Sequence, residues 1–176
     1  MKTLLSENQL QSGVARLADE IATFYGRDPL TIVGILTGSV VLLADLIRQL
    51  EMPLRVGVLQ ASSYRQGSTR GVLEINAEMM LDVQGRDVLL VDDIFDTGHT
   101  LLEVISQLHQ LEINSVRSAV LLRKQGRQEV DLEPDFVGFD IPDAFVVGYG
   151  LDYQDLYRNL RSLAVLEPDD LSDDER

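Results

Sequence analysis

Apolar residues recur along the chain at two spacings, which predict alternating helices and strands. A first helix is predicted to begin after Ser6, because Ser6 and Gln9 form a capping box, and to end at Gly26. Helical spacing returns at residues 40–50 and 101–111. The predicted strands and β-segments cover residues 30–36, 55–60, 72–81, 88–91, 116–122, 135–141, 144–147 and 162–166, and a turn of helix is expected within 153–160. This alternation predicts an α/β fold with a mostly parallel central sheet flanked by helices.

Two segments lack such a pattern. Residues 61–71 are polar without periodicity and are predicted to form a long mobile loop, of a length at which loops often act as lids. Residues 167–176 are acidic and are predicted to be a disordered tail. The length of 176 residues indicates one domain, which we expect to cover residues 1–166.

Composition and charge limit the classes of function. Hydrophobic residues make up 45% of the chain and charged residues 25%, as in proteins with a packed core. There is no cysteine, so thiolate chemistry and disulfides are excluded. No apolar run approaches the roughly 20 residues of a membrane span, and no signal peptide is evident, so we expect a cytoplasmic protein without a membrane partner. The net charge of −14 predicts that nucleic acid is repelled and that phosphate groups are bound by local N–H groups, a metal ion and a few cations.

The segment after the predicted strand 88–91 carries the strongest chemical signal. That strand is apolar throughout, which is typical of burial on both faces, and Asp92, Asp93 and Asp96 follow it. Carboxylates crowded at a strand end repel one another unless a cation or hydroxyl groups use them. Residues 97–100, Thr-Gly-His-Thr, then begin a helix, whose N-terminal N–H groups form a site for anions. A ligand with a sugar diol beside a phosphate would satisfy both halves.

These residues also have structural interpretations. Asp96 or Thr97 would serve as a helix N-cap without any ligand. Asp92 and Asp93 resemble the metal-binding acid pair of a response-regulator receiver domain, but a receiver carries that pair near its first strand and its acceptor aspartate at another strand. A dinucleotide-binding interpretation fails because no G-x-G-x-x-G follows a strand.

Five stretches of the chain, in the same order, resemble those of one enzyme family. They are residues 36–39, 62–64, 88–101, 121–124, and 134–139 continuing through 145–153. The third resembles the phosphoribosyl-pyrophosphate (PRPP) binding motif of type I phosphoribosyltransferases, and the last resembles the hypoxanthine/guanine branch. The resemblance extends over roughly residues 7–166. It implies a small hood region formed by the chain ends, and a homodimer or homotetramer.

The resemblance implies roles for the acidic cluster and the helix start. Asp92 and Asp93 match acids that hold the ribose hydroxyls, directly or through Mg²⁺, and Asp96 matches the proposed general base for purine N7. The loop that wraps the 5-phosphate of PRPP is matched by Thr97, Gly98, His99 and Thr100. Carboxylates near the ribose suit a transition state with positive charge on the sugar, and Mg²⁺ suits the departing pyrophosphate.

Later residues match the purine site of the same branch. Lys124 matches the lysine that donates to the purine 6-oxo group, Phe145 the aromatic that stacks on the base, and Val146 the residue whose backbone pairs with the base edge. Asp152 matches an acid near a second Mg²⁺ and the pyrophosphate, and it helps to read the purine 2-position. Taken alone, Lys124 is typical of a surface lysine and Phe145 of a core residue.

The resemblance assigns the pyrophosphate of PRPP to residues from three parts of the chain: Thr37, Gly38, Ser63, Tyr64 and Arg158. The family usually has lysine where Thr37 stands and often has a cis peptide bond there, so we expect a cis Leu36–Thr37 bond. Without that cation, pyrophosphate binding would depend on backbone N–H groups, Mg²⁺ and Arg158. His99 replaces an apolar residue or lysine, and we expect its side chain to face solvent.

These matches imply a purine-salvage transferase. It would make the nucleotide products IMP and GMP from PRPP and a 6-oxopurine base, hypoxanthine or guanine, releasing pyrophosphate and requiring Mg²⁺. Two alternatives remain open. One is a regulator of the same fold that binds nucleotides and RNA, against which the net charge of −14 counts. The other is a transferase that prefers xanthine or a pyrimidine.

Overall fold

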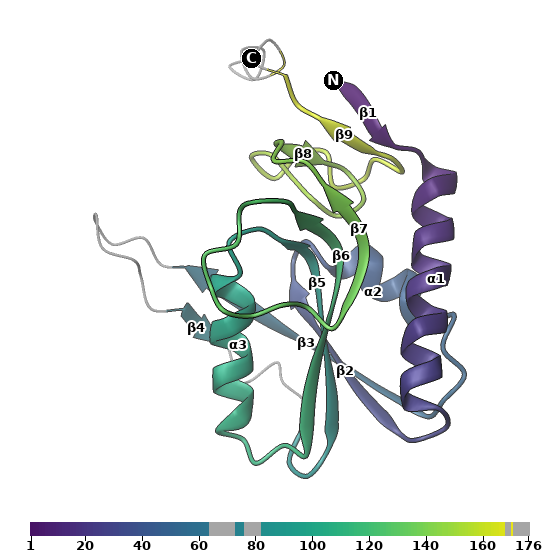
Figure 1. Cartoon of the computed structure of the whole chain (residues 1–176), viewed down its shortest axis with the longest axis vertical. Helices are drawn as coiled ribbons and strands as arrows, with labels where there is room; N and C mark the ends of the chain where they lie inside the picture. The colour runs from purple at the N-terminus through teal and green to yellow at the C-terminus, as the bar shows by residue number, and fades with distance from the viewer. Residues whose placement is uncertain (64–72, 76–81, 168–169, 171–176) are drawn as a thin grey trace.

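A six-stranded sheet forms the centre of the molecule (Figure 1). The computed structural model describes residues 1–63, 73–75, 82–167 and 170. Within these residues the strand order is β4-β3-β2-β5-β6-β7, and all neighbours are parallel except β3 and β4. The strands are β2 (Leu30–Leu36), β3 (Leu54–Ser63), β4 (Leu73–Ile75), β5 (Asp87–Phe95), β6 (Ser115–Lys124) and β7 (Phe136–Ile141). The predicted α/β fold with a mostly parallel sheet is therefore confirmed.

A second, antiparallel sheet is built from the two ends of the chain. Its strands are β1 (Lys2–Leu5), β9 (Leu163–Val165) and β8 (Val146–Val147), in that order. It lies beyond the carboxyl ends of the parallel strands, with the N-terminus beside it (Figure 1). The sequence pattern did not predict β1, because its four residues are exposed or only partly buried and have no apolar alternation.

Three helices cover the two faces of the central sheet within the described residues. α1 (Glu7–Tyr25) and α2 (Val40–Ile47) pack on one face and α3 (His99–His109) on the other (Figure 1). The predicted capping box is present at the start of α1, and Gly26 ends that helix. In β5, Leu89 contributes to the core under α1, whereas Leu90 contributes to the core under α3. Burial on both faces explains why this strand is apolar at every position from residue 88 to 91.

The order of the strands defines where a ligand is expected. α2 leads the chain from β2 to β3, and α3 leads it from β5 to β6, in the opposite direction across the sheet. Since β2 and β5 are neighbours, the direction reverses between their carboxyl ends. Open α/β sheets bind ligands at such a reversal. The β2–α2 and β5–α3 connections are therefore the structural centre of the candidate site.

Four predictions about local structure were wrong in part. Residues 61–63 were expected in a loop, but they extend β3 and pair with β4; the rest of the predicted loop lies outside the described residues. β5 extends to Phe95, beyond the predicted end at residue 91. Residues 153–160 form no helix, because Gln154, Asp155 and Tyr157 have positive φ angles. An isolated antiparallel bridge joins residues 153 and 156 instead. The helix predicted at 40–50 ends earlier, at Ile47.

Candidate active site

A cavity of about 330 Å³ lies at the carboxyl ends of β2 and β5. Three segments line it: the β2–α2 turn with Thr37 and Gly38, the β5–α3 connection, and a C-terminal segment with Asp152 and Arg158. The peptide bond between Leu36 and Thr37 is cis, as predicted. Residues that lie more than 100 positions apart in the sequence thus share one cavity.

Two adjacent carboxylates form the floor of this cavity. Asp92 is buried, with 8% of its surface exposed, and its Oδ1 accepts a hydrogen bond from the backbone N–H of Asp93 at 3.0 Å. Burial raises the pKa of Asp92 well above its ordinary value, and the charge of Asp93 raises it further. Burial also raises the pKa of Asp93, although the backbone N–H of Ile94 and the charge of Arg158 act in the other direction. A cation or hydroxyl donors in contact with the two carboxylates would reduce their mutual repulsion and the cost of burying their charges.

Gly38 lets the β2–α2 turn approach this pair closely. A Cβ atom at position 38 would lie 1.7 Å from Oδ2 of Asp93, far inside any real contact. On its other side, the carbonyl of Gly38 lies against Gly150, where a Cβ atom would be 2.2 Å from that oxygen. Gly150 has φ +102°, which L side chains rarely adopt. Two glycines therefore allow the turn, the carboxylates and the C-terminal segment to meet.

Replacement of Gly38 by alanine tests the importance of this close approach. We expect Gly38→Ala to displace the Asp93 carboxylate and to raise the KM for PRPP, the substrate that the sequence resemblance implies, about tenfold, the effect of losing one hydrogen bond to a charged group. Steady-state kinetics with varied PRPP measures it. Gly26→Ala is the control, because a Cβ atom there meets no atom within 4 Å; its strain at φ +63° should lower the melting temperature without changing KM. Equal KM values for wild type and Gly38→Ala would contradict the expectation.

The C-terminal wall of the cavity is an ion pair. Arg158 Nη2 lies 2.8 Å from Oδ1 of Asp152, and Arg158 Nη1 donates to the carbonyl of Gly150 at 2.8 Å. The other carboxylate oxygen of Asp152 accepts from the backbone N–H of Asp155 at 2.9 Å. These contacts hold the guanidinium at the rim of the cavity, where it also acts on Asp93. The structure therefore brings Asp152 and Arg158 together with the acidic pair.

The start of α3 closes the opposite side of the cavity. Thr97, Gly98 and Thr100 line it, and Gly98 is the N-cap, with φ +89° and no side chain to cap the helix. A Cβ atom at Gly98 would lie 2.4 Å from Val130 Cγ2. Helix N-termini that lack a side-chain cap leave N–H groups available to an anion. The backbone of this turn thus faces the cavity as a phosphate site would require.

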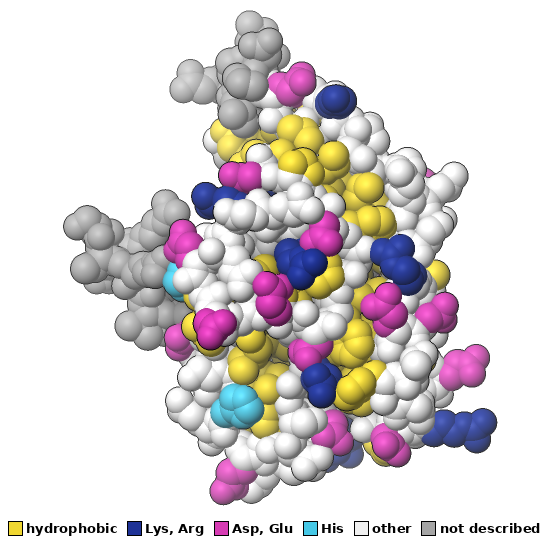
Figure 2. Space-filling model, viewed as in Figure 1, with side chains coloured by type: hydrophobic (Ala, Val, Ile, Leu, Met, Phe, Trp, Pro, Cys, Tyr) yellow, Lys and Arg dark blue, Asp and Glu magenta, His cyan; other side chains and the backbone are white. Residues whose placement is uncertain are grey.

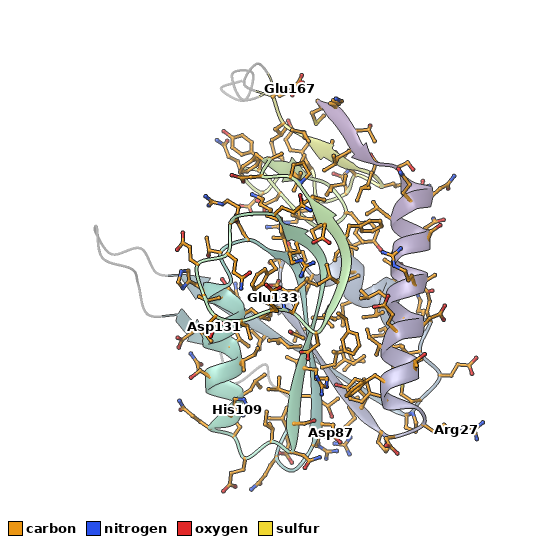
Figure 3. The ribbon with its side chains drawn as sticks, in the orientation of Figure 1. Arg27, Asp87, His109, Asp131, Glu133 and Glu167 are labelled. Atoms are coloured by element: carbon orange, nitrogen blue, oxygen red, sulfur yellow. The ribbon has the colours of Figure 1, made fainter. Side chains whose placement is uncertain are left out.

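His99 takes a different direction from its neighbours. Its Nε2 lies 2.9 Å from Oε2 of Glu129, and the side chain does not line the cavity. The ring is 36% exposed, so it lies at the surface but is paired there. The other histidine, His109, lies at the opposite end of α3 (Figure 3).

Asp96 is held by two cations at the edge of the cavity. Lys124 Nζ lies 3.2 Å from its Oδ2, and Arg127 Nε lies 3.0 Å from its Oδ1. Burial raises the pKa of Asp96, but hydrogen bonds from Arg127 and Lys124 lower it by more, so that the net pKa is lower than usual. Lys124 is only 11% exposed. The surface-lysine interpretation of Lys124 is therefore wrong, because the side chain points inward to Asp96.

The remaining predicted residues lie outside the cavity lining. Phe145 is 50% exposed and packs edge-to-face on Tyr153, with 5.6 Å between ring centroids. Val146 is buried in β8. Ser63 is the last residue of β3, and Tyr64 lies outside the described residues. The interpretation of Phe145 as a core residue is therefore wrong, because its side chain is half exposed.

The sequence pattern missed two charged residues next to Asp96. Arg127 follows β6 by three residues, and Asp143 lies in the β7–β8 turn, 3.6 Å from Lys124 Nζ. Both lie at the carboxyl edge of the sheet, where the polar residues of neighbouring strands converge. Their position just after predicted strands was the signal from which these two residues could have been predicted.

The chain matches a known family over most of its length. The model of the phosphoribosyl transferase domain matches residues 1–154. The chain therefore belongs to the phosphoribosyl transferase domain family, as the sequence resemblance indicated. Its relatives there include the hypoxanthine-guanine phosphoribosyltransferase of Aquifex aeolicus, which is 40% identical over 169 residues that cover 95% of each chain. The protein of the same name from Staphylococcus aureus is 37% identical, over 96% of this chain and 94% of its own.

Solved structures of the same branch have the same fold. The hypoxanthine phosphoribosyltransferase of Staphylococcus aureus superimposes with a TM-score of 0.90 at 37% identity, covering 96% of this chain and 92% of that one. A Trypanosoma cruzi hypoxanthine phosphoribosyltransferase, in a ternary complex with substrates, superimposes with a TM-score of 0.90 at 34% identity, covering 98% of each chain. The chain is thus a phosphoribosyltransferase, and its relatives place it in purine salvage.

Proposed function

We propose that this enzyme transfers the 5-phosphoribosyl group of PRPP to hypoxanthine and guanine, forming IMP and GMP. One observation supports this most strongly: a buried carboxylate pair and an uncapped helix N-terminus meet in one cavity, beside an aspartate–lysine pair. The carboxylates suit a ribose, the helix N-terminus suits its phosphate, and the aspartate–lysine pair suits a base with both a proton to lose and an oxo group.

The site residues have complementary roles in this proposal. Asp92 and Asp93 hold the ribose hydroxyls, residues 97–100 hold the 5-phosphate through backbone N–H groups and hydroxyls, and Arg158 contacts the pyrophosphate. Lys124 donates to the purine 6-oxo group. The exposed ring of Phe145 offers a stacking surface for the base, and the backbone of Val146 pairs with the edge of the base. Thr37 and Gly38 line the pyrophosphate side of the cavity, and the sequence resemblance assigns Ser63 and Tyr64 to the same group.

The reaction is a displacement at C1 of the ribose. The bond from C1 to purine N9 forms as the bond from C1 to the pyrophosphate oxygen breaks, and that bond's electron pair leaves with pyrophosphate. The N7 proton passes to a carboxylate oxygen of Asp96. Positive charge develops on the sugar in the transition state, and the two carboxylates beneath it, Asp92 and Asp93, stabilise that charge.

Mg²⁺ fits the donor set of this cavity. Asp92 and Asp93 are close together, and burial raises the pKa of each, so a cation would relieve both desolvation and mutual repulsion. Among the described residues, no three acidic or histidine side chains form a ready-made metal site. Mg²⁺ is commonly held by one or two carboxylates together with substrate phosphates, and we propose Asp92, Asp93 and Asp152 as the protein ligands. Bound there, it would neutralise charge on the departing pyrophosphate.

The surface does not favour the RNA-binding alternative. On the part of the face in Figure 2 that the structure describes, Lys and Arg side chains are interspersed with Asp and Glu. Binding to a nucleic acid backbone depends on clustered cations, and the net charge of −14 opposes it. Within the described residues, none of the helices is both long enough and apolar enough to cross a membrane.

An ultraviolet assay with PRPP and separate bases tests the proposed function. With Mg²⁺ we expect nucleotide formation from hypoxanthine and guanine, and removal of Mg²⁺ by a chelator should abolish it, with recovery on re-addition. Xanthine and uracil should react at least tenfold more slowly, since each one alters the pattern of donors and acceptors that the site reads. Turnover of xanthine alone would support the xanthine-preferring alternative. No turnover of any base by folded protein that binds PRPP would contradict the proposal.

A further inference from the structure

Four charged side chains meet at the edge of the cavity where the base would lose its proton. Asp96 follows β5, Lys124 and Arg127 lie at and just after the end of β6, and Asp143 lies between β7 and β8. Asp143 Oδ1 lies 3.6 Å from Lys124 Nζ and 3.7 Å from Arg127 Nε, so it faces both cations. The formal charges of the four side chains cancel. The structure thus holds Asp96 in a balanced network before any purine is bound.

The two cations use different oxygens of Asp96. Arg127 Nε donates to Oδ1 at 3.0 Å, whereas Lys124 Nζ donates to Oδ2 at 3.2 Å. A general base needs one free oxygen, directed at the proton that it takes. While Lys124 donates to Oδ2, one lone pair of that oxygen is occupied and its basicity is lowered. If Lys124 moves to the purine 6-oxo group, Oδ2 becomes available and Oδ1 remains held by Arg127.

We propose that Arg127 is a positioning residue. Its hydrogen bond keeps Asp96 in place while the ammonium group of Lys124 moves from Asp96 to the purine 6-oxo group. This inference rests on the proposed function. It couples recognition of the 6-oxo group to the basicity of Asp96: a purine without that oxo group leaves Lys124 on Oδ2, and Asp96 is then a weaker acceptor for the N7 proton. Specificity for 6-oxopurines is thereby built into the proton transfer as well as into binding.

The electrostatics of the network agree with this sequence of events. Burial raises the pKa of Asp96, but the hydrogen bonds and the charges of Arg127 and Lys124 together lower it below its usual value in the free protein. Departure of Lys124 removes the contribution of one of these two cations, so Asp96 becomes a stronger base when purine is present. The other charged groups near this network are Asp143, described above, and Glu129, which pairs with His99 next to the phosphate loop.

Kinetics of an Arg127→Met variant test the inference. We expect kcat/KM for hypoxanthine to fall about tenfold, the effect of one lost hydrogen bond to a charged group, while the Kd for PRPP stays unchanged. Because Arg127 lowers the pKa of Asp96, its loss should move the acid limb of the pH profile of kcat/KM to higher pH. Arg127→Lys should recover part of the activity and shift the limb back.

The matched control is Arg161→Met, which removes the same charge from an exposed surface pair with Glu7, 3.6 Å apart. It should leave both kcat/KM and the pH profile unchanged. If Arg127→Met behaves like this control, or loses activity with an unmoved acid limb, the positioning role is wrong although the enzyme still salvages purines. If the wild type itself forms no nucleotide, the proposed function fails, and this inference fails with it.

Discussion

Substitution of Asp96 by asparagine is expected to abolish most turnover and to leave PRPP binding intact. Asparagine keeps the size of the side chain and can still contact Lys124 or Arg127, but it cannot accept the N7 proton. General bases contribute about 10²- to 10⁴-fold to rate, and we expect a loss of kcat in this range. Steady-state kinetics measures kcat, and isothermal titration calorimetry measures the Kd for PRPP.

Asp131→Asn provides the control for that experiment. Asp131 is exposed on the loop after β6 (Figure 3), so the same chemical change there should not affect kcat. Unchanged turnover in Asp96→Asn would refute the assignment of Asp96 as the base. A large loss of PRPP affinity would instead assign Asp96 to ribose or phosphate binding.

Replacement of Lys124 by methionine is expected to weaken purine binding more than it changes PRPP binding or kcat. Methionine is one atom shorter and removes the donor, so the 6-oxo group would lose its partner at a position where Lys124 itself is only 11% exposed. Losing a hydrogen bond to a charged donor costs about 1.5–3 kcal/mol, so the KM for hypoxanthine should rise about 10- to 150-fold. Substrate-varied kinetics with saturating PRPP measures the change.

The chain provides a matched control for this lysine as well. It has one other lysine, Lys2, which is exposed in β1. Lys2→Met changes the net charge equally and should leave KM for hypoxanthine as it was. If the KM for PRPP rises instead in Lys124→Met, Lys124 belongs to the phosphate side of the cavity and its assignment to the purine is wrong.

Apolar patterning was sufficient to predict the central elements of the fold. β2 was predicted with its observed bounds, Leu30–Leu36, and α1 with both of its ends, because a buried parallel strand and an amphipathic helix leave strong periodic signals. β5 was predicted too short. Asp92 pairs with Val120 of β6, and Asp93 lies within the same strand, before the paired residues Ile94 and Phe95. A polar residue at a strand end looks like a loop residue unless the neighbouring strand is known.

The candidate site was predictable only as far as its motifs are local in the sequence. The segment from Asp92 to Thr100 is contiguous, so its residue types were informative without a structure. Arg127 and Asp143 were missed because each one gains its meaning from Lys124 or Asp96, on other elements. The bends near Gln154 were missed because positive φ at a residue other than glycine leaves no sequence signal.

The contact between Gly38 and Gly150 has a consequence for the order in which the enzyme acquires its activity during synthesis. The β2–α2 turn leaves the ribosome early, whereas Asp152 and Arg158, which complete the cavity, emerge after the whole central sheet. β1 likewise waits for β9, the most C-terminal strand among the described residues, before it has a partner. A nascent chain that has already built its central sheet therefore lacks one wall of its site. Substrate can stabilise only chains whose synthesis has passed Arg158, so nucleotide binding reports that the site has been assembled.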